Sequence, residues 1–423
     1  MVTRDRLTKA LVTAAVLFFL GLGFVTILRA TKAYKRTDFT VYLAAADSVL
    51  RGGDDLYRVE NERGWHYLYL PLFAIVMVPL ARLPLLWASL LWYVISVILA
   101  IWAARMCVAM AWRNSSRPPG PLLYALPICL IGWPLMSALT RGQASVLLLW
   151  LVLAAVYYHW KGRRSAASAC LAGAVVLKIF PVLLLGYYAF RRDWRFVSAT
   201  LVGIVIGVYL VPAAVLGPPQ NSARLREWVA LVANPALDMK AAPDSDRYVE
   251  LLDPQRSRNQ SLQAVLFRLT GSPGVRGTAA GIAFLMAIAI GLAGRRAPAS
   301  NQWLIMCAVF PWILLVSPVS WNHYFVLLLL PLTALVFLAA HEPDATTRRL
   351  SRITLGMFGP VNLIGKLLEY WGPLCWSTLI LWGILLHAAI HSTSYGNVVR
   401  SGWTAGAPWS HGTEQDRTPT PGE

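Results

Sequence analysis

The sequence predicts an all-α protein that crosses a membrane many times, and two observations lead to this fold class. Hydrophobic residues make up 57% of the 423 residues and charged residues only 14%, whereas soluble domains carry roughly a quarter charged residues. The apolar residues also form many separate runs rather than one anchor. Since a spanning helix needs about 20 mostly apolar residues, we expect about 11–13 transmembrane or re-entrant helices. Most soluble enzymes are excluded.

The excess of basic residues has two possible meanings. The chain carries 38 Lys and Arg against 20 acidic residues, a formal charge of +18, which in a soluble protein would suggest a nucleic-acid partner. Here the basic residues fall in short clusters between apolar runs, the pattern that orients membrane proteins. We therefore expect the lipid bilayer, and no nucleic acid, as a partner.

Eleven apolar runs define the expected membrane segments in chain order. They cover residues 10–30, 84–107, 122–140, 144–160, 165–190, 196–216, 278–294, 303–316, 324–340, 353–368 and 373–390. The basic clusters between them can all lie on the cytoplasmic side after two adjustments. Residues 70–80 are too short to cross and become interfacial or re-entrant. Residues 165–190 are interrupted by Lys178 and Pro181 and become a hairpin with Lys178 near its extracytoplasmic tip.

This topology predicts the domain organisation. Residues 1–391 form one multi-pass domain in the plasma (inner) membrane, with a first extracytoplasmic loop at 31–69 and a long one at 217–275. In this topology the polar motifs of the chain share the extracytoplasmic face. Residues 392–423 are rich in Gly, Ser, Thr and Pro, and we expect a disordered cytoplasmic tail.

The first extracytoplasmic loop contains an acidic candidate, Asp38. Its apolar spacing predicts a short amphipathic helix that begins near Asp38. The carboxylate could serve catalysis, or it could simply cap the helix or interact with its dipole. Further along this loop, Asp54 and Asp55 follow two glycines and are typical of a turn.

His323 follows a polar turn, Ser317 to Asn322, at the start of a long apolar run. An ionisable side chain at this depth is costly unless it faces a cavity or a partner. It could act as a general base or hydrogen-bond a departing phosphate. A satisfied interfacial histidine is the structural alternative.

Several cationic and amide side chains could bind an anion on the same face. Lys178 lies in apolar surroundings, where an ammonium needs either a lipid phosphate or a route to the interface. The segments Arg141-Gly142-Gln143 and Arg258-Asn259-Gln260-Ser261 add further donors, although such loop residues are often merely solvated. No nucleotide-binding glycine motif is present, so nucleotide chemistry is not expected.

Taken in order, the motifs resemble glycosyltransferase family 87, membrane enzymes of the GT-C class that use polyprenyl-phosphate sugars. The resemblance covers most of the chain and is carried by residues 38–42, 52–57, 69–73, 141–143, 177–181, 259–262 and 317–323. It implies a GT-C fold with an extracytoplasmic active site, which a lipid-linked sugar enters from the membrane. The chain departs from the family at Tyr324, where a second histidine is common, and at Leu70, where a proline is common.

The resemblance implies roles for the motif residues. An acidic residue of the first loop is the expected catalytic group, which maps onto Asp38, with His323 as second catalytic candidate. We assign Lys178, Arg258 and Arg141 to the donor phosphate. The remaining candidates for substrate binding are Tyr42, Tyr69, Gln143, Asn259, Gln260, Trp321 and Asn322.

The expected reaction is inverting transfer of a hexose, mannose, from a polyprenyl-phosphate donor to a lipid-anchored glycan, giving an α-glycoside. A lipid phosphate is already a good leaving group, so we expect neither a metal nor a cofactor. A polyprenyl-phosphate-arabinose-dependent arabinofuranosyltransferase is the alternative within the family. A transporter or flippase for a lipid-linked sugar is the alternative outside it, although no internal repeat of broken segments supports it.

Overall fold

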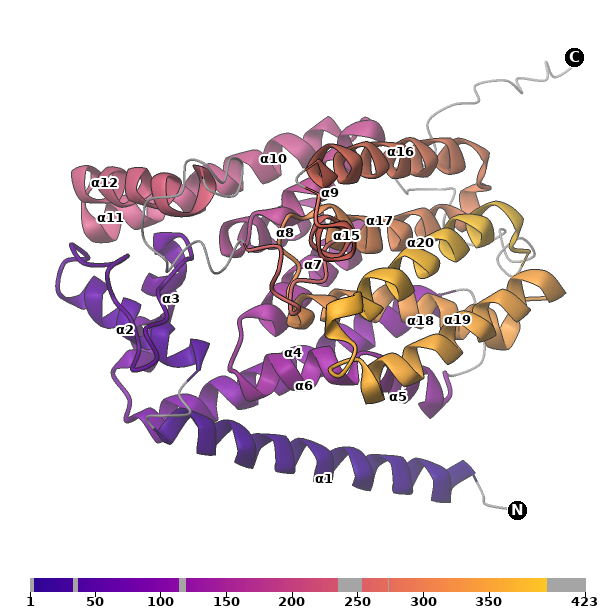
Figure 1. The fold of residues 1–423 in the computed structure, drawn as a ribbon, viewed down its shortest axis with the longest axis horizontal. Coiled ribbons are helices and arrows are strands. Elements are labelled where there is room, and N and C mark those ends of the chain that lie inside the picture. The colour runs from indigo at the N-terminus through magenta and orange to yellow at the C-terminus, as the bar shows by residue number, and fades with distance from the viewer. Residues whose placement is uncertain (1–3, 33–36, 114–118, 235–252, 273, 394–423) are drawn as a thin grey trace, which may run out of the picture.

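The computed structural model describes residues 4–32, 37–113, 119–234, 253–272 and 274–393, and this part of the chain is helical. Figure 1 shows the helices, which confirm the all-α prediction. Their order is α1 (Arg4–Thr31), α2 (Asp38–Leu50), α3 (Pro71–Ala81), α4 (Leu85–Ala111), α5 (Pro121–Leu130), α6 (Gly132–Thr140), α7 (Ser145–Trp160), α8 (Arg164–Leu177), η2 (Phe180–Val182), α9 (Leu183–Phe190), α10 (Trp194–Val205), η3 (Ile206–Leu210), α11 (Val211–Leu216), α12 (Pro218–Trp228), η4 (Val229–Ala233), α15 (Leu262–Thr270), α16 (Val275–Arg296), η6 (Ala299–Asn301), α17 (Gln302–Val316), η7 (Asn322–Leu328), α18 (Leu329–His341), α19 (Ala345–Ile364), η8 (Glu369–Trp371) and α20 (Pro373–His391).

Seven helical segments of the described chain are long and apolar enough to cross a membrane, and one bent pair could form an eighth span. The seven cover Thr13–Thr31, Leu85–Ala111, Trp194–Leu216, Val275–Arg296, Ala299–Val316, Asn322–His341 and Pro373–His391. Four shorter apolar helices accompany them. The predicted span at 353–368 is not among the seven, because α19 begins earlier, in a basic stretch, and ends at Ile364.

Contacts between distant segments define two ends of the helical bundle. We call one the site end: there Trp92 donates from its Nε1 to the Gly142 carbonyl, and Lys178 donates to the Tyr324 hydroxyl. At the other, which we call the opposite end, Arg164 pairs with Asp193, and Arg113 donates to the Ser300 carbonyl. In Figure 1, α2, α3, α11 and α12 gather at the left, and α1 begins at the right.

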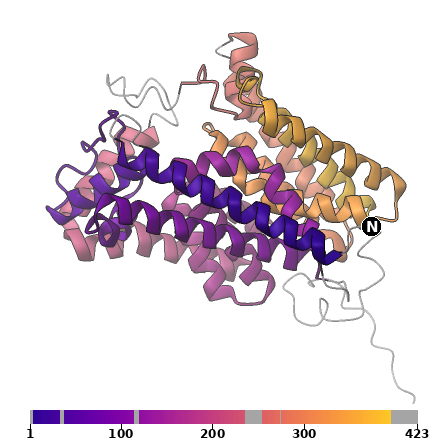
Figure 2. The same ribbon diagram turned by 90° about the horizontal axis from the view of Figure 1, so that it is seen from below.

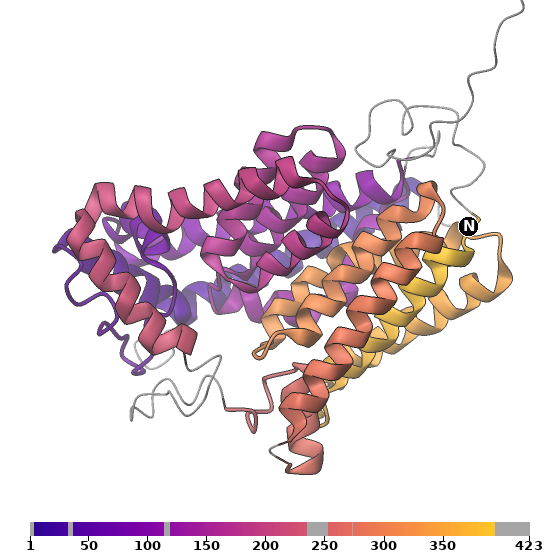
Figure 3. The same ribbon diagram turned by 90° about the horizontal axis from the view of Figure 1, so that it is seen from above.

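Two turned views show how the helices pass one another. Figure 2 shows α1 lying across the helices behind it, among which it packs on α4 and α6. A hydrogen bond from the Thr26 hydroxyl to the Leu139 carbonyl, 3.2 Å long, fixes α1 to α6. Figure 3 shows α15 projecting beyond the layer that contains α16 and α20.

The predicted span at 122–140 is bent rather than straight. Its two halves, α5 and α6, meet at an angle of 70°. A bend leaves backbone groups without helical hydrogen-bond partners. The side chain of Asn362 in α19 provides partners for two of these groups. Its amide nitrogen donates to the Leu130 carbonyl at 2.6 Å, and its oxygen accepts from the Trp133 amide at 2.8 Å. The bend therefore depends on a helix more than 200 positions away in the chain.

The segment 164–193 leaves the opposite end and returns to it, as the hairpin prediction requires. Helix α8 ends at Leu177, Lys178 is extended, and η2 restarts the chain at Phe180 with Pro181 in its first turn. The return brings Asp193 within 3.7 Å of Arg164. Lys178 accordingly lies at the site end, where it meets Tyr324.

The two remaining loop predictions fall partly on residues 235–252 and 394–423, outside the described chain. Within the long loop at 217–275, the chain forms α12, η4 and α15. The first two residues of the predicted disordered tail are held in place, because Ser392 and Thr393 both donate to the buried carboxylate of Glu342.

Candidate active site

Asp38 is the first residue of α2, as its sequence predicted. The N-cap is Thr37, whose side chain makes no capping bond, so capping does not explain the Asp38 carboxylate. Its Oδ2 atom is buried and has no hydrogen-bond partner among the described residues. A buried oxygen without a partner is costly. The Oδ2 atom thus keeps an unused acceptor, while the position of Asp38 in the first turn of α2 also suits the helix dipole.

The turn Arg141-Gly142-Gln143 lies against the start of α2. Gly142 has φ +61°, and a Cβ atom there would lie 2.7 Å from the Cβ of Phe39, so only glycine fits. This close approach places Gln143 so that its side chain accepts a hydrogen bond from Tyr42 at 3.2 Å and also hydrogen-bonds Asp38. The turn Arg141-Gly142-Gln143 thus packs directly beside the Asp38 carboxylate.

Lys178 lies close to two tyrosine rings, near the same part of the site. Its Nζ atom lies 4.8 Å from the ring centroid of Tyr69 and 4.2 Å from that of Tyr324, and it donates to the Tyr324 hydroxyl at 2.7 Å. Tyr69 also bonds Tyr42, hydroxyl to hydroxyl, at 2.9 Å. Tyr324, the position that departs from the family pattern, is thus the hydrogen-bond partner of Lys178.

Asn259 joins the loop before α15 to the turn 317–323. Its side-chain oxygen accepts from the Ser320 and Ser261 amides at 2.9 and 3.1 Å, and its nitrogen donates to the Pro318 carbonyl. The backbones of Asn259 and Trp321 form an isolated β-bridge. Both polar atoms of this side chain bond to the protein, so Asn259 joins these two segments.

Gln260 and Arg268 tie the same loop to η8. Gln260 donates from Nε2 to the Glu369 carbonyl at 2.7 Å. Arg268 donates to the carbonyls of Arg256, Asn259 and Tyr370 at 2.8–3.0 Å. These bonds join α15 and the loop before it to η8, and the bonds of Asn259 add the turn before η7.

A cavity of about 530 Å³ opens at this end. One part of its wall is apolar and comes from α1 and α6. The rest is polar, with several cations and one carboxylate. Its lining residues are Leu22, Val25, Arg29, Thr37, Arg63, Trp65, Trp133, Met136, Ser137, Thr140, Arg141, Arg258, Asn322, His323, Lys366 and Glu369.

The cavity divides the predicted site residues into groups. Arg141, Arg258, Asn322 and His323 line it. Asp38, Tyr42, Tyr69, Gln143 and Lys178 lie beside it in the connected network described above and are not part of its lining. Asn259, Gln260 and Trp321 form bonds or backbone contacts between segments and are also not part of the lining. The Oε1 atom of Gln260 is buried and has no partner among the described residues.

Two of the four arginines in the lining, Arg141 and Arg258, are available to bind an anion. Neither Arg141 nor Arg258 forms a hydrogen bond or an ion pair with another described residue. The guanidinium of Arg141 lies 5.9 Å from the ring centroid of Trp65. Guanidinium groups suit phosphate because they offer several N–H donors in a fixed plane.

Sequence reasoning missed four charged residues in the lining: Arg29, Arg63, Lys366 and Glu369. The sequence did contain an indication for Lys366 and Glu369. The predicted topology already placed the connection between the last two apolar runs on the same face as the motifs, and Lys366 and Glu369 flank its start. Arg29 donates to the Thr140 hydroxyl at 3.0 Å, a contact between α1 and α6 that no local pattern reveals.

Burial dominates the electrostatics of Asp38. Desolvation raises the pKa of its carboxyl above the ordinary value, while Arg141, the hydrogen bond from Gln143 and Lys178 act in the opposite direction. A raised pKa makes a carboxylate a stronger base toward a hydroxyl group. Among the residues described, no group of three or more His, Cys, Asp or Glu side chains could hold a metal ion.

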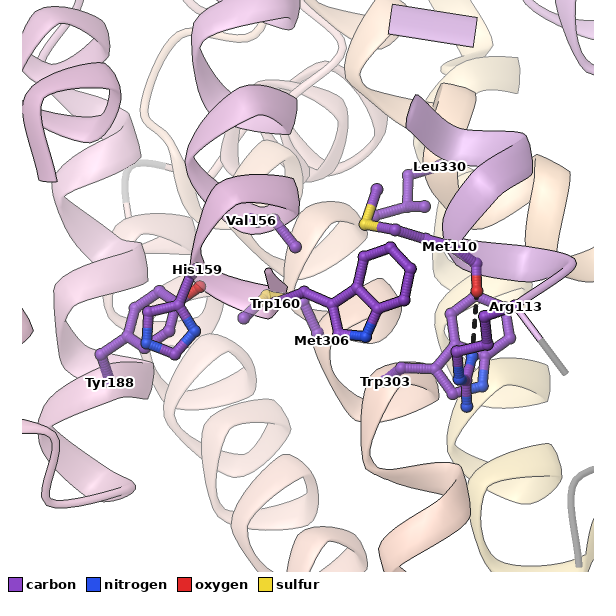
Figure 4. A pocket seen from close by; sticks show the side chains of 9 residues that line it. All are labelled: Met110, Arg113, Val156, His159, Trp160, Tyr188, Trp303, Met306 and Leu330. Carbon is purple, nitrogen blue, oxygen red and sulfur yellow. Dashed lines mark hydrogen bonds between the residues drawn. The ribbon is translucent and has the colours of Figure 1, made fainter. Parts of the chain in front are cut away.

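The opposite end contains a second, much smaller pocket of about 30 Å³. Figure 4 shows its lining, in which His159 and Tyr188 lie to one side and Arg113 and Trp303 to the other. His159 bonds Asp193 at 2.9 Å, and Arg113 donates to the Met110 and Ser300 carbonyls. This pocket is too small for a sugar, and its charged side chains are engaged with the protein.

A polytopic helical fold with a large cavity lined by several cations at one end defines the class as a multi-pass membrane protein. The family model for glycosyltransferase family 87 matches residues 67–318, more than half of the chain. The chain belongs to this family and is a membrane glycosyltransferase. Asp38 and His323 both lie outside the matched residues, so their placement at the site rests on the structure.

A curated relative agrees with this assignment. The chain is 24% identical over 383 residues to a polyprenol-phosphate-mannose-dependent alpha-(1-2)-phosphatidylinositol mannoside mannosyltransferase of Mycobacterium tuberculosis. The alignment covers 82% of this chain and 83% of the relative. It therefore extends beyond the residues that the family model matches, into the rest of the helical domain.

Proposed function

We propose that the protein transfers a hexose, mannose, from a polyprenyl-phosphate donor to a hydroxyl group of a lipid-anchored glycan, on the extracytoplasmic side of the plasma membrane. The observation that carries this proposal is the composition of the cavity wall. Apolar residues Leu22, Val25 and Met136 line one part, and the unpaired Arg141 and Arg258 line another. A polyprenyl phosphate has the same two parts, an apolar chain and an anion.

Asp38 is the proposed general base. Asp38 lies outside the cavity lining, so this role requires the acceptor hydroxyl to enter beside Arg141 and reach the unpartnered Oδ2 atom. That atom then accepts the hydroxyl proton, and the hydroxyl oxygen attacks the anomeric carbon of the donor sugar. The bond from that carbon to the phosphate oxygen breaks, and the oxygen leaves with the electron pair as polyprenyl phosphate. Attack from the face opposite the phosphate inverts a β-linked donor into an α-glycoside.

The cations of the wall stabilise the charge that develops on the departing phosphate. Arg141 and Arg258 line the cavity without other partners, so they can contact the phosphate directly. His323 also lines the cavity, and its imidazole can donate a hydrogen bond to the same group. Lys178 lies outside the lining, so we propose that its charge acts on the site at longer range, through Asp38.

The sidedness follows from charge. The basic clusters 161–164, 191–195, 295–296 and 348–352 all adjoin helix ends at the opposite end of the bundle. Basic residues at helix ends favour the cytoplasm. The site end therefore faces away from the cytoplasm in this proposal.

The test is transfer of radiolabelled mannose from synthetic polyprenyl-phosphate mannose to membrane glycolipid by purified, reconstituted protein. We expect transfer by wild type and a loss of about 10³-fold in Asp38→Asn, which keeps the shape but removes the base. Asp47→Asn, an exposed aspartate on the same helix, is the matched control and should be fully active.

Each other outcome is informative. Normal turnover by Asp38→Asn removes Asp38 from the mechanism. A wild type that transfers arabinose and not mannose replaces the hexosyltransferase with the arabinofuranosyltransferase. A wild type that transfers no sugar but moves a fluorescent polyprenyl-phosphate sugar between bilayer leaflets is a flippase instead.

A further inference from the structure

The side chains of Asn322 and Glu369 form a hydrogen-bonded pair that offers acceptor oxygens in a cavity otherwise rich in cations. Asn322 donates from Nδ2 to the Oε1 atom of Glu369 at 2.6 Å. Because the amide nitrogen must face the carboxylate, the Asn322 oxygen is directed away from it. That Oδ1 atom is buried and has no hydrogen-bond partner among the described residues.

Both residues belong to the lining of the cavity. Asn322 is only 7% exposed, and it lines the cavity together with Glu369. Glu369 contributes the only carboxylate among the lining residues, and within the described chain it forms no ion pair. Its Oε2 atom accepts from Ser257 at 3.3 Å, a long bond that leaves lone pairs available.

Such a pair selects the chemistry of its partner. An amide oxygen and a carboxylate can only accept hydrogen bonds, so they repel a phosphate and bind O–H groups. The free arginines Arg141 and Arg258 have the opposite preference. The cavity wall is therefore divided into an anion-binding region and a region that binds hydroxyl groups.

The pair is also held firmly in place. Gln260 donates to the backbone carbonyl of Glu369, and Arg268 donates to that of Tyr370. Asn322 begins η7, next to the β-bridge between Trp321 and Asn259. Groups fixed in this way lose little conformational entropy when a ligand binds.

We propose that Asn322 and Glu369 form a subsite that binds two hydroxyl groups of one sugar ring and thereby select the sugar. This inference rests on the proposed function. The ring belongs either to the donor or to the acceptor, since both carry neighbouring hydroxyl groups. Glu369 is the residue that sets the specificity, and the bonds from Gln260 and Asn322 position it.

The experiment compares wild type with Glu369→Gln, which can still accept the bond from Asn322 and should therefore fold. The donor arm uses polyprenyl-phosphate mannose and its four monodeoxy analogues. The acceptor arm uses octyl α-mannoside and its monodeoxy analogues with the intact donor. Transfer is measured as kcat/KM for each compound, and Asp47→Asn is the control.

We expect wild type to disfavour one or two deoxy compounds of one arm by about 10-fold or more, because the missing hydroxyl leaves a buried acceptor unpaired. Glu369→Gln should lose most of that discrimination, and the arm affected identifies the ring. Equal discrimination by wild type and Glu369→Gln in both arms overturns the inference while the proposed function stands. A wild type that transfers no sugar from any polyprenyl phosphate overturns both.

Discussion

The two ends of the helical bundle contain similar side chains that are used differently. Each end has a buried histidine, His323 at the site end and His159 at the opposite end, 5% and 2% exposed. His159 bonds Asp193 at 2.9 Å and packs between the rings of Tyr188 and Phe196. The imidazole of His323 contacts the ring of Tyr324 and has no hydrogen-bond partner within the described chain.

The two ends of the bundle also differ in the volume of their cavities and in the pairing of the polar atoms nearby. The pocket at the opposite end measures about 30 Å³, and the cavity at the site end about 530 Å³. At the site end, oxygens of Asp38 and Asn322 are buried without partners. Burying a polar group without a partner destabilises the fold by about 1–3 kcal/mol. Such atoms also occur away from the cavity, for example the hydroxyl groups of Ser168 and Thr347. The combination of unpartnered oxygens with a large cavity, rather than a missing partner alone, therefore distinguishes the site end.

The same substitution at the two histidines gives the largest predicted contrast. His323→Gln should lower kcat/KM for transfer about 100-fold and leave thermal stability unchanged, because it removes a group that faces the cavity. His159→Gln should leave kcat/KM unchanged and lower the midpoint of thermal unfolding by several degrees, because it weakens a buried bond. The measurements are transfer kinetics and unfolding in detergent. Loss of stability without loss of activity in His323→Gln would assign that histidine to structure.

Two glycines with positive φ offer a second matched pair. Gly142 at the site end has φ +61° and lies against Phe39, while Gly162 at the opposite end has φ +72° and no atom within 4 Å of the point that an added Cβ atom would occupy. Alanine at either position must adopt the left-handed backbone, which costs about 1–2 kcal/mol. Gly142→Ala should cost more than Gly162→Ala by about 1–3 kcal/mol, and it alone should reduce transfer. Equal losses of stability would mean that the Phe39 contact relaxes freely.

Features of the fold and the site could be predicted from the sequence where neighbouring residues determine them. Features that depend on contacts between segments far apart in the chain could not. Asp38 and His323 stand out because an ionisable residue next to an apolar run is conspicuous in the sequence itself. The bend between α5 and α6 depends on Asn362, and the bonds of Arg268 go to backbone carbonyls. Backbone carbonyls are the same in every residue, so no sequence pattern could indicate these partners.

Glu369 illustrates the same limit inside the site. Its role depends on η8 folding against the loop before α15, which Gln260 and Arg268 hold in place. The sequence shows only one acidic residue between two apolar runs. The motif residues Asn259 and Gln260 were predicted to bind substrate, yet their described bonds join segments of the protein. A motif can thus be essential to a site without touching the ligand.

The pH dependence of kcat/KM tests whether the charge of Lys178 acts on Asp38. Burial raises the pKa of Asp38, so the ionised base is lost, and kcat/KM falls, as the pH drops through that raised value. Arg141, Gln143 and Lys178 all favour the ionised form. Lys178→Met removes one positive charge and should move the acid limb to higher pH. Lys366→Met, a cavity cation that is not among the groups acting on Asp38, should not move it. An unmoved limb in Lys178→Met would separate Lys178 from the base.

The smallest predicted effect concerns the pocket at the opposite end. Its volume of about 30 Å³ is close to that of one water molecule in the liquid, and Val156 is part of its apolar lining. Val156→Ile adds one methylene group to this space and should stabilise the fold by about 0.5–1 kcal/mol, which thermal unfolding can detect. Transfer kinetics should not change, because the pocket adjoins the bonds of His159 and Arg113 rather than the cavity with unpaired arginines. A change in kcat/KM would show that the two ends are coupled, and the contrast between a structural end and a catalytic end would then be too simple.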